Sequence, residues 1–187
     1  RLVGSEMCIR DRYLGEFQSD ESILIIQNNG DFYTTDFDLN NHYDADIQRI
    51  EKYDPEKVWT AVLYDADQQN YPYLKRFTFE ATAKKQNYLG ENKHNKLILL
   101  SEQVFPRIQV VFGGHDDFRE PLIVEASDFV GVKSYKAKGK RLTTYTVGNI
   151  EELEPTRMPE PEDTTEPEAG DDEATNDNGD NGQMNLF

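Results

Sequence analysis

Short apolar stretches follow one another between residues 23 and 147, separated by turn-forming residues. The stretches are rich in Val, Ile, Phe and Tyr, which favour strands. No part of the chain keeps the i, i+3, i+4, i+7 apolar spacing of an amphipathic helix over three turns, although residues 79–89 and 125–129 could each hold a helical turn. The pattern predicts an all-β fold.

The turn signals divide this region into four predicted strand pairs. The first joins residues 23–27 to residues 31–35 through Asn29 and Gly30, because Asn-Gly accepts the positive φ angles of a tight hairpin turn. The other pairs are residues 58–64 with 73–79, 96–100 with 107–112, and a strand near 129 with 142–147. First strands near residues 23, 58, 97 and 129 indicate blades of a propeller-like array, although the irregular spacing also fits a β-sandwich.

The composition changes abruptly after Glu151. Residues 158–187 contain ten acidic residues, no basic residue and several Pro and Gly, with almost nothing apolar before the last few positions. Such a segment buries too little apolar surface to offset the entropy of ordering, so we expect it to be disordered. With a boundary near Pro155, we interpret residues 13–152 as a folded region and residues 153–187 as a disordered acidic tail.

The first twelve residues have no apolar period that suits a helix or a strand. Residues 4–11 read GSEMCIRD, which is the translation of eight successive codons of a transposase sequencing adapter. We therefore interpret residues 1–12 as an adapter-derived artefact that is not native, with a natural N-terminal arm as the alternative. On this interpretation Cys8 is not native, and we expect the chain to be the C-terminal piece of a longer protein.

The net charge of −16 is unevenly distributed. Residues 13–72 carry −10 and residues 151–187 carry −12, whereas residues 73–150 carry +5, so the acidic average conceals a basic stretch. No apolar run approaches the roughly 18 residues that span a bilayer, and we expect no membrane-spanning segment. The single Cys excludes a disulfide framework and a Cys-based zinc site, which fits a reducing cytoplasm.

The sequence shows no convincing catalytic constellation. Its three histidines stand in polar contexts without an HExxH or paired-Cys spacing. Two acidic turns, at residues 65–67 and 115–117, invite a metal site, but turn geometry alone favours Asp at such positions. The phosphate-binding patterns GxxxxGK[ST] and GxGxxG are missing. We therefore expect no catalytic residue, cofactor site or metal site in this chain.

The basic stretch is more informative. Its densest part, residues 133–141, contains five cations and no acid, and Gly139 within it permits close backbone approach. If the strand pairs stack as blades, the basic clusters recur along one rim, where cations neutralise phosphates and release counterions. The alternative is that these lysines are solvated residues that keep strand edges from pairing. The predicted DNA-binding residues are Lys75, Arg76, Lys84, Lys85, Lys133, Lys136, Lys138, Lys140 and Arg141.

Several strings resemble the C-terminal region of the A subunits of the DNA gyrase/topoisomerase IV family, in particular versions from Bacteroidetes-type bacteria. Together the strings cover most of the chain after residue 12. They are EKYDPEKVWTAVLYDAD at residues 51–67, YPYLKRFTFEAT at 71–82, RIQVVFGG at 107–114, REPLIV at 119–124, KSYKAKGKRLTTY at 133–145 and ELEPTR at 152–157.

The resemblance implies a partial β-pinwheel, a bladed domain whose basic rim bends or wraps double-stranded DNA. The family enzyme is a heterotetramer of two A and two B subunits that passes one duplex through another with ATP and Mg²⁺, in the bacterial cytoplasm at the nucleoid. Its catalytic Tyr and Mg²⁺-binding acids lie in regions that this sequence does not match. KAKGKRL, at residues 136–142, is at most a degenerate form of the glutamine-arginine-glycine box of gyrase, so the resemblance favours topoisomerase IV-like relaxation and decatenation.

The last residues carry a second expectation. Gln183, Met184, Leu186 and Phe187 resemble the QLxLF peptide that binds the bacterial sliding clamp, with a frayed terminus as the alternative. The acidic tail itself is expected either to compete with DNA for the basic stretch or to serve solubility alone. For the whole chain, the competing interpretation is a β-propeller-like protein-interaction module whose basic loops are incidental.

Overall fold

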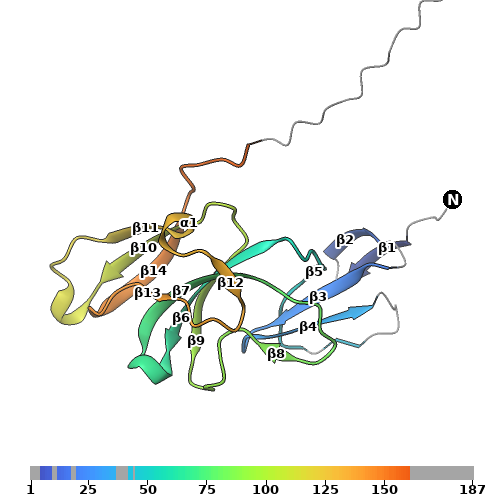
Figure 1. The fold of residues 1–187 in the computed structure, drawn as a ribbon, viewed down its shortest axis with the longest axis horizontal. Coiled ribbons are helices and arrows are strands. Elements are labelled where there is room, and N and C mark those ends of the chain that lie inside the picture. The colour runs from blue at the N-terminus through green and yellow to red at the C-terminus, as the bar shows by residue number, and fades with distance from the viewer. Residues whose placement is uncertain (1–4, 10–11, 18–19, 37–41, 44, 161–187) are drawn as a thin grey trace, which may run out of the picture.

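The structure, a computed structural model, describes residues 5–9, 12–17, 20–36, 42–43 and 45–160. Three β-sheets pack in a row, and a two-stranded sheet of β1 (Ser5–Ile9) and β2 (Arg12–Phe17) lies at the N-terminal end (Figure 1). We name the three the first, middle and last sheets in chain order. Within the described residues, no helix has both the length and the apolar character needed to cross a bilayer.

The first sheet has the strand order β5-β3-β4-β8. Its strands are β3 (Ser22–Gln27), β4 (Asp31–Asp36), β5 (Ile47–Lys52) and β8 (Gln86–Asn87). The predicted β3–β4 hairpin is confirmed, and within its Asn29-Gly30 pair only Gly30 takes a positive φ, +88°. A Cβ at Gly30 would lie 2.5 Å from Cγ of Leu89, so the turn needs glycine both for its φ angle and for space.

The middle sheet has the order β12-β7-β6-β9, and β13 also pairs with β7. Its strands are β6 (Val58–Asp65), β7 (Tyr71–Thr78), β9 (Lys96–Ser101), β12 (Val132–Ser134) and β13 (Lys140–Arg141). The predicted β6–β7 hairpin is confirmed, with a short 3-10 helix at Ala66–Gln68 in its loop. Because this sheet is covered on both faces, β6 is buried almost throughout and is nearly continuous in apolar residues.

The last sheet has the order β11-β10-β14. Its strands are β10 (Arg107–Phe112), β11 (Leu122–Glu125) and β14 (Val147–Leu153). A 3-10 helix at Gly114–Asp116 lies between β10 and β11, and α1 (Ala126–Phe129) follows β11. The helical turn expected at residues 125–129 is therefore confirmed, whereas residues 79–89 contain β8 and no helix.

Two of the four predicted hairpins are wrong. Strand β9 does not pair with β10; it pairs with β6 in the middle sheet, while β10 pairs with β11 and β14 in the last. Strand β9 is apolar on both faces, with Leu97 and Leu100 toward one core and Ile98 and Leu99 toward the other, which suits a strand of the middle sheet between the two cores. The fourth pair fails likewise, since residues 132–141 join β7 and β14 joins β10.

All three sheets share one plan. Each contains a hairpin, β3–β4, β6–β7 or β10–β11, and a later strand, β5, β9 or β14, adds to the hairpin's first strand. A crossing segment that follows the next hairpin adds to the second strand: residues 79–95 place β8 on β4, and residues 130–146 place β12 and β13 on β7. The orange β12 accordingly lies on the green middle sheet in Figure 1. The all-β, blade-like prediction is confirmed.

Two cores separate the three sheets. Between the first and middle sheets, Phe79 packs against the rings of Phe32, Trp59, Phe77 and Tyr88 at centroid distances of 4.6 to 5.5 Å. The second core, between the middle and last sheets, is aliphatic. Its buried members are Val62, Leu74, Ile108, Val110, Val124, Ala126, Leu142 and Ile150.

Candidate nucleic-acid interface

The basic clusters lie on the two crossing segments. Lys84 and Lys85 directly precede β8, at the outer edge of the first sheet. Residues 133–141, which we name the basic loop, run along the outer edge of the middle sheet. The clusters meet where the hydroxyl of Tyr135 donates to Oε1 of Gln86 at 3.4 Å. Both clusters therefore occupy edge positions of adjoining sheets.

The basic loop is fastened to β7 at both ends. Strand β12 pairs with β7 in parallel, with Lys133 opposite Phe77, and β13 pairs antiparallel, with Lys140 opposite Leu74. Between them the chain lifts away from the strand and returns at Gly139, whose φ is +88°. A Cβ at Gly139 would lie 2.5 Å from the carbonyl oxygen of Leu74, so the predicted close backbone approach is present.

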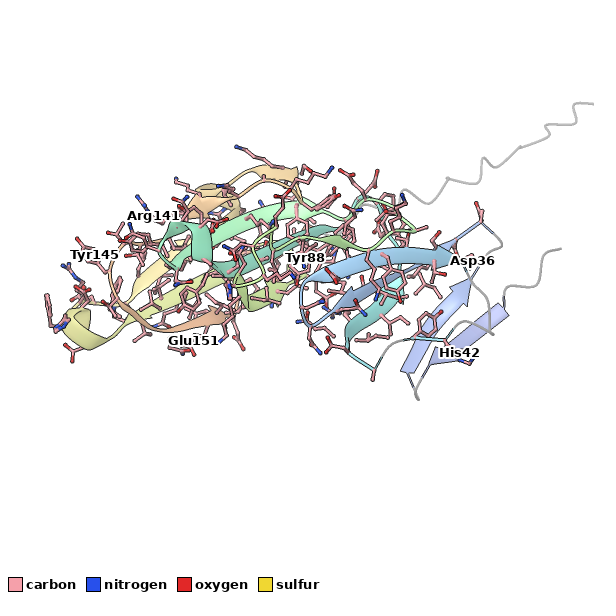
Figure 2. All side chains as sticks on the ribbon, turned by 90° about the horizontal axis from the view of Figure 1, so that it is seen from below. Asp36, His42, Tyr88, Arg141, Tyr145 and Glu151 are labelled. Atoms are coloured by element: carbon pink, nitrogen blue, oxygen red, sulfur yellow. The ribbon has the colours of Figure 1, made fainter. Side chains whose placement is uncertain are left out.

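The five cations of the basic loop are exposed. They are Lys133, Lys136, Lys138, Lys140 and Arg141. Aromatic rings lie beneath three of them: Lys140 Nζ is 4.3 Å from the Phe129 centroid, and Lys136 and Arg141 approach Tyr135 and Tyr71 at 5.6 and 5.3 Å. The sequence prediction did not include these rings. Figure 2 shows Arg141 at the edge of the molecule opposite Glu151.

The basic loop also differs from the other cations in its partners. Among the described residues, none of its five cations forms an ion pair with a carboxylate. Elsewhere in the described part of the chain, six cations are paired with Asp or Glu: Arg49, Lys52, Lys57, Arg107, Arg119 and Arg157. An anion from outside the described part of the chain can therefore bind the loop without first displacing a carboxylate of that part.

The structure buries Lys75, one of the predicted DNA-binding residues. Its side chain is buried, with 4% of the residue exposed, and its ammonium donates to the carbonyl oxygens of Tyr88, of Tyr135 at 2.6 Å and of Ala137 at 3.2 Å. Burial lowers the pKa of Lys75 to about 8. Its donors are occupied inside the protein, so Lys75 is not placed to contact a phosphate.

The remaining predicted residues differ among themselves. Arg76 is half-buried, its pKa is lowered by burial, and its Nη2 donates to the carbonyl oxygen of Val104 at 3.3 Å. Because side chains alternate along a strand, Arg76 lies on the opposite face of β7 from Lys75. Lys84 and Lys85 are exposed, and Lys85 Nζ lies 5.7 Å from the ring centroid of Tyr33.

The acidic turns have structural partners. Asp116 accepts from Nε of Arg119 at 3.0 Å and from the backbone N–H of Thr146 at 2.8 Å, and the Thr146 bond followed by the Arg119 bond lowers the pKa of Asp116. Asp65 caps the 3-10 helix by accepting from the N–H of Asp67 at 2.9 Å. Across the residues described, no group of three or more His, Cys, Asp or Glu is arranged to hold a metal ion.

Three sequence predictions fall partly or wholly outside the described residues. Gln183, Met184, Leu186 and Phe187 lie in residues 161–187, as does most of the acidic tail. The adapter interpretation of residues 1–12 stays a prediction, although part of this stretch, residues 5–9, forms β1.

Most of the chain matches one known protein family. A family model described as "Topoisomerase C-terminal domain, Bacteroidota" matches residues 8–154, which is more than three quarters of the chain. No curated protein matches. The matched range includes the three sheets and the basic loop. The chain belongs to the topoisomerase C-terminal domain family of the Bacteroidota.

Proposed function

We propose that the chain is the DNA-binding C-terminal portion of the A subunit of a type IIA topoisomerase, and that its basic rim presents duplex DNA for strand passage. In the holoenzyme of two A and two B subunits, strand scission and ATP hydrolysis with Mg²⁺ take place in other regions. The rim formed by the basic loop and by Lys84 and Lys85 captures the substrate.

One observation carries the proposal. The basic loop gathers five exposed cations at a sheet edge, and none of them has a carboxylate partner among the described residues, although the chain is acidic overall. Leaving cations unpaired in an acidic protein is expected where an external polyanion supplies the counter-charge. Membership of a topoisomerase family makes duplex DNA the polyanion of choice.

The geometry suits binding that depends on the phosphate backbone and tolerates any base sequence. Lysines along an edge contact phosphates, which position the duplex without reading its bases. The rings beneath Lys136, Lys140 and Arg141 hold these side chains near the sheet by cation–π contact. Smooth bending of a short duplex by 40–90° costs on the order of 1–6 kcal/mol, which distributed phosphate contacts offset.

The basic loop favours a topoisomerase IV-like role. Its string KAKGKRL keeps the cations and one glycine of the gyrase box but not the glutamine-arginine-glycine order that the family resemblance associates with strong wrapping. We therefore expect the holoenzyme to relax and decatenate DNA, and not to introduce negative supercoils.

Charge reversal at the loop tests the proposal. We expect Lys136→Glu with Lys138→Glu to weaken binding of a short linear duplex equally for different base sequences. The slope of log K against log salt should fall in magnitude by about 0.9 for each phosphate that the variant no longer neutralises. The matched control is Lys52→Glu with Arg157→Glu, which changes the net charge equally at cations that already have partners, Glu21 and Asp128. An unchanged slope in the loop variant would contradict the proposal.

A competition experiment separates this proposal from the alternative of a protein-interaction module. Heparin and plain duplex DNA should compete with each other for the wild-type chain. If neither binds, the basic loop is incidental and the module interpretation holds.

A further inference from the structure

Lys75 is, among the described residues, the one lysine or arginine that the structure buries. It comes from β7, the strand to which the basic loop is fastened. A buried ammonium is costly unless hydrogen bonds compensate it, so the partners of Lys75 indicate what its burial achieves.

Those partners belong to the two crossing segments. The carbonyl oxygens of Tyr135 and Ala137 lie in the basic loop, and that of Tyr88 lies beside β8. A single side chain thus joins both segments that carry the basic clusters to β7. The hydrogen bonds fall where the backbone of the loop leaves the strand ladder, between Ser134 and Lys140.

The direction of these carbonyls sets the direction of the N–H groups of the residues that follow them. In a trans peptide the C=O points opposite to the N–H of the next residue. With the oxygens of Tyr135 and Ala137 turned inward to Lys75, the N–H groups of Lys136 and Lys138 are directed away from it. The side chains of both lysines are exposed.

The geometry points to Lys75 as a positioning residue for the proposed DNA interface: its ammonium holds the basic loop against β7 in the conformation that presents Lys136 and Lys138 to phosphates, and it touches no DNA. The consequence for DNA rests on the proposed function, whereas the fastening of the loop rests on the three hydrogen bonds alone.

Gly139 provides a second handle on the same loop, and it involves no charge. Because a Cβ there would lie 2.5 Å from the Leu74 oxygen and 2.9 Å from Cβ of Lys75, Gly139→Ala pushes the loop off β7. Gly131→Ala is the matched control, since a Cβ at Gly131 has no neighbour within 4 Å and its φ is not in the left-handed region.

The test uses the full chain, with Lys75→Met and Gly139→Ala compared with wild type and Gly131→Ala. Amide hydrogen exchange should become faster at residues 134–141 in both test variants and stay unchanged in β3 and β10. Both variants should bind a short linear duplex about tenfold more weakly, because a loop that must be ordered on binding loses preorganisation. Their salt slopes should equal that of wild type, because the lysines that contact phosphate are all present.

Two results would overturn the inference. One is unchanged exchange at residues 134–141 in Lys75→Met; should that variant not fold, Gly139→Ala decides in its place. The other is a salt slope that falls in magnitude by about 0.9 in Lys75→Met, which is the mark of a direct phosphate contact. If wild type itself binds no duplex, the proposed function fails, and the exchange result alone decides whether Lys75 holds the loop.

Discussion

The ammonium of Lys57 lies 2.6 Å from a carboxylate oxygen of Glu102 and 4.5 Å from the ring centroid of Trp59. Glu102 follows the last residue of β9 in the middle sheet, and Arg49 from β5 of the first sheet also reaches it at 2.6 Å. This cluster therefore joins the first and middle sheets at the surface, above the buried Trp59.

Glu102 makes the stability of this junction dependent on pH. The hydrogen bond from Lys57, followed by the charge of Arg49, holds the pKa of Glu102 below its usual value. A lowered folded-state pKa contributes stability above the unfolded value, near 4.5, and this contribution is lost as pH falls through the folded value. We expect Glu102→Gln to lower the free energy of unfolding at pH 7 by about 1 kcal/mol or less, because the pair is partly exposed.

Urea unfolding at several pH values would check this prediction. The difference between wild type and Glu102→Gln should shrink toward zero as the pH drops below the folded-state pKa of Glu102. Glu120→Gln is the control, since Glu120 is exposed and forms no ion pair with a described residue. A difference that is the same in acid and at neutral pH would show that Glu102 acts through packing and not through its charge.

Phe79 is the second junction between these sheets. It touches aromatic rings from three segments, Phe32 in β4, Trp59 in β6 and Tyr88 after β8. We expect Phe79→Ala to lower the free energy of unfolding by about 3–5 kcal/mol, the usual cost of a cavity of this size. Phe118→Ala removes the same side chain from a position that is 75% exposed, and should change stability by less than about 0.5 kcal/mol. Equal effects in thermal unfolding would contradict the role of Phe79.

The sequence predicted local pairings better than long-range ones. The β3–β4 and β6–β7 hairpins follow from their own residues, because a turn and two flanking strands lie together in the chain. The crossing segments do not: β8 reaches back to β4 and β12 to β7 across intervening strands. No turn signal specifies which edge receives such a strand, since the choice depends on which edge the rest of the fold leaves free.

The candidate site shows the same limit. The exposed lysines of the basic loop were visible as a run of cations, but Lys75 beside Arg76 looked like one more pair of surface cations. Strand alternation carried the missing signal, because Lys75 shares a face of β7 with Tyr73 and Phe77, which pack into the first core. What the sequence could not supply was the position of the Tyr135 and Ala137 carbonyls that compensate the buried charge.

Because Lys75 is buried, the free energy of unfolding should also increase with pH in the alkaline range. Its pKa is about 8 in the folded protein, against an ordinary value of 10.5, so between these pH values the unfolded chain binds the extra proton. The contribution of Lys75 to the free energy of unfolding therefore increases as pH rises from 8 toward 10, by up to about 1.4 kcal/mol per pH unit. Burial raises the pKa of Tyr88, so this tyrosine stays protonated over the same range.

Unfolding measured at several pH values between about 7.5 and 9.5 would check the sign, since this interval brackets the folded-state pKa. Wild type should gain stability relative to Lys75→Met across this range. The side-chain nitrogen resonance of Lys75 should titrate near pH 8, well below the ordinary lysine value of 10.5. Titration of Lys75 at the ordinary value of 10.5 would contradict its burial.

The acidic tail bears on DNA binding through the same basic loop. Residues 158–187 carry ten acids and no cation, and a tethered segment of this kind reaches effective concentrations in the millimolar range beside the domain. We therefore predict that the tail competes with phosphates, and that a chain ending at Arg157 binds duplex DNA more tightly at low salt. Salt screens both interactions, so the affinities of the two chains should converge as ionic strength rises.

A tail of the same length in which every Asp and Glu from residue 158 onward becomes Asn or Gln separates charge from bulk. If repulsion and competition by charge are the cause, the neutral tail should raise affinity as much as the deletion does. A duplex titration at low salt in which the neutral tail behaves like wild type, while the deletion binds more tightly, would assign the effect to steric exclusion. Equal affinity of all three chains would leave the tail without influence on the rim, which is the outcome expected of a segment that serves solubility alone.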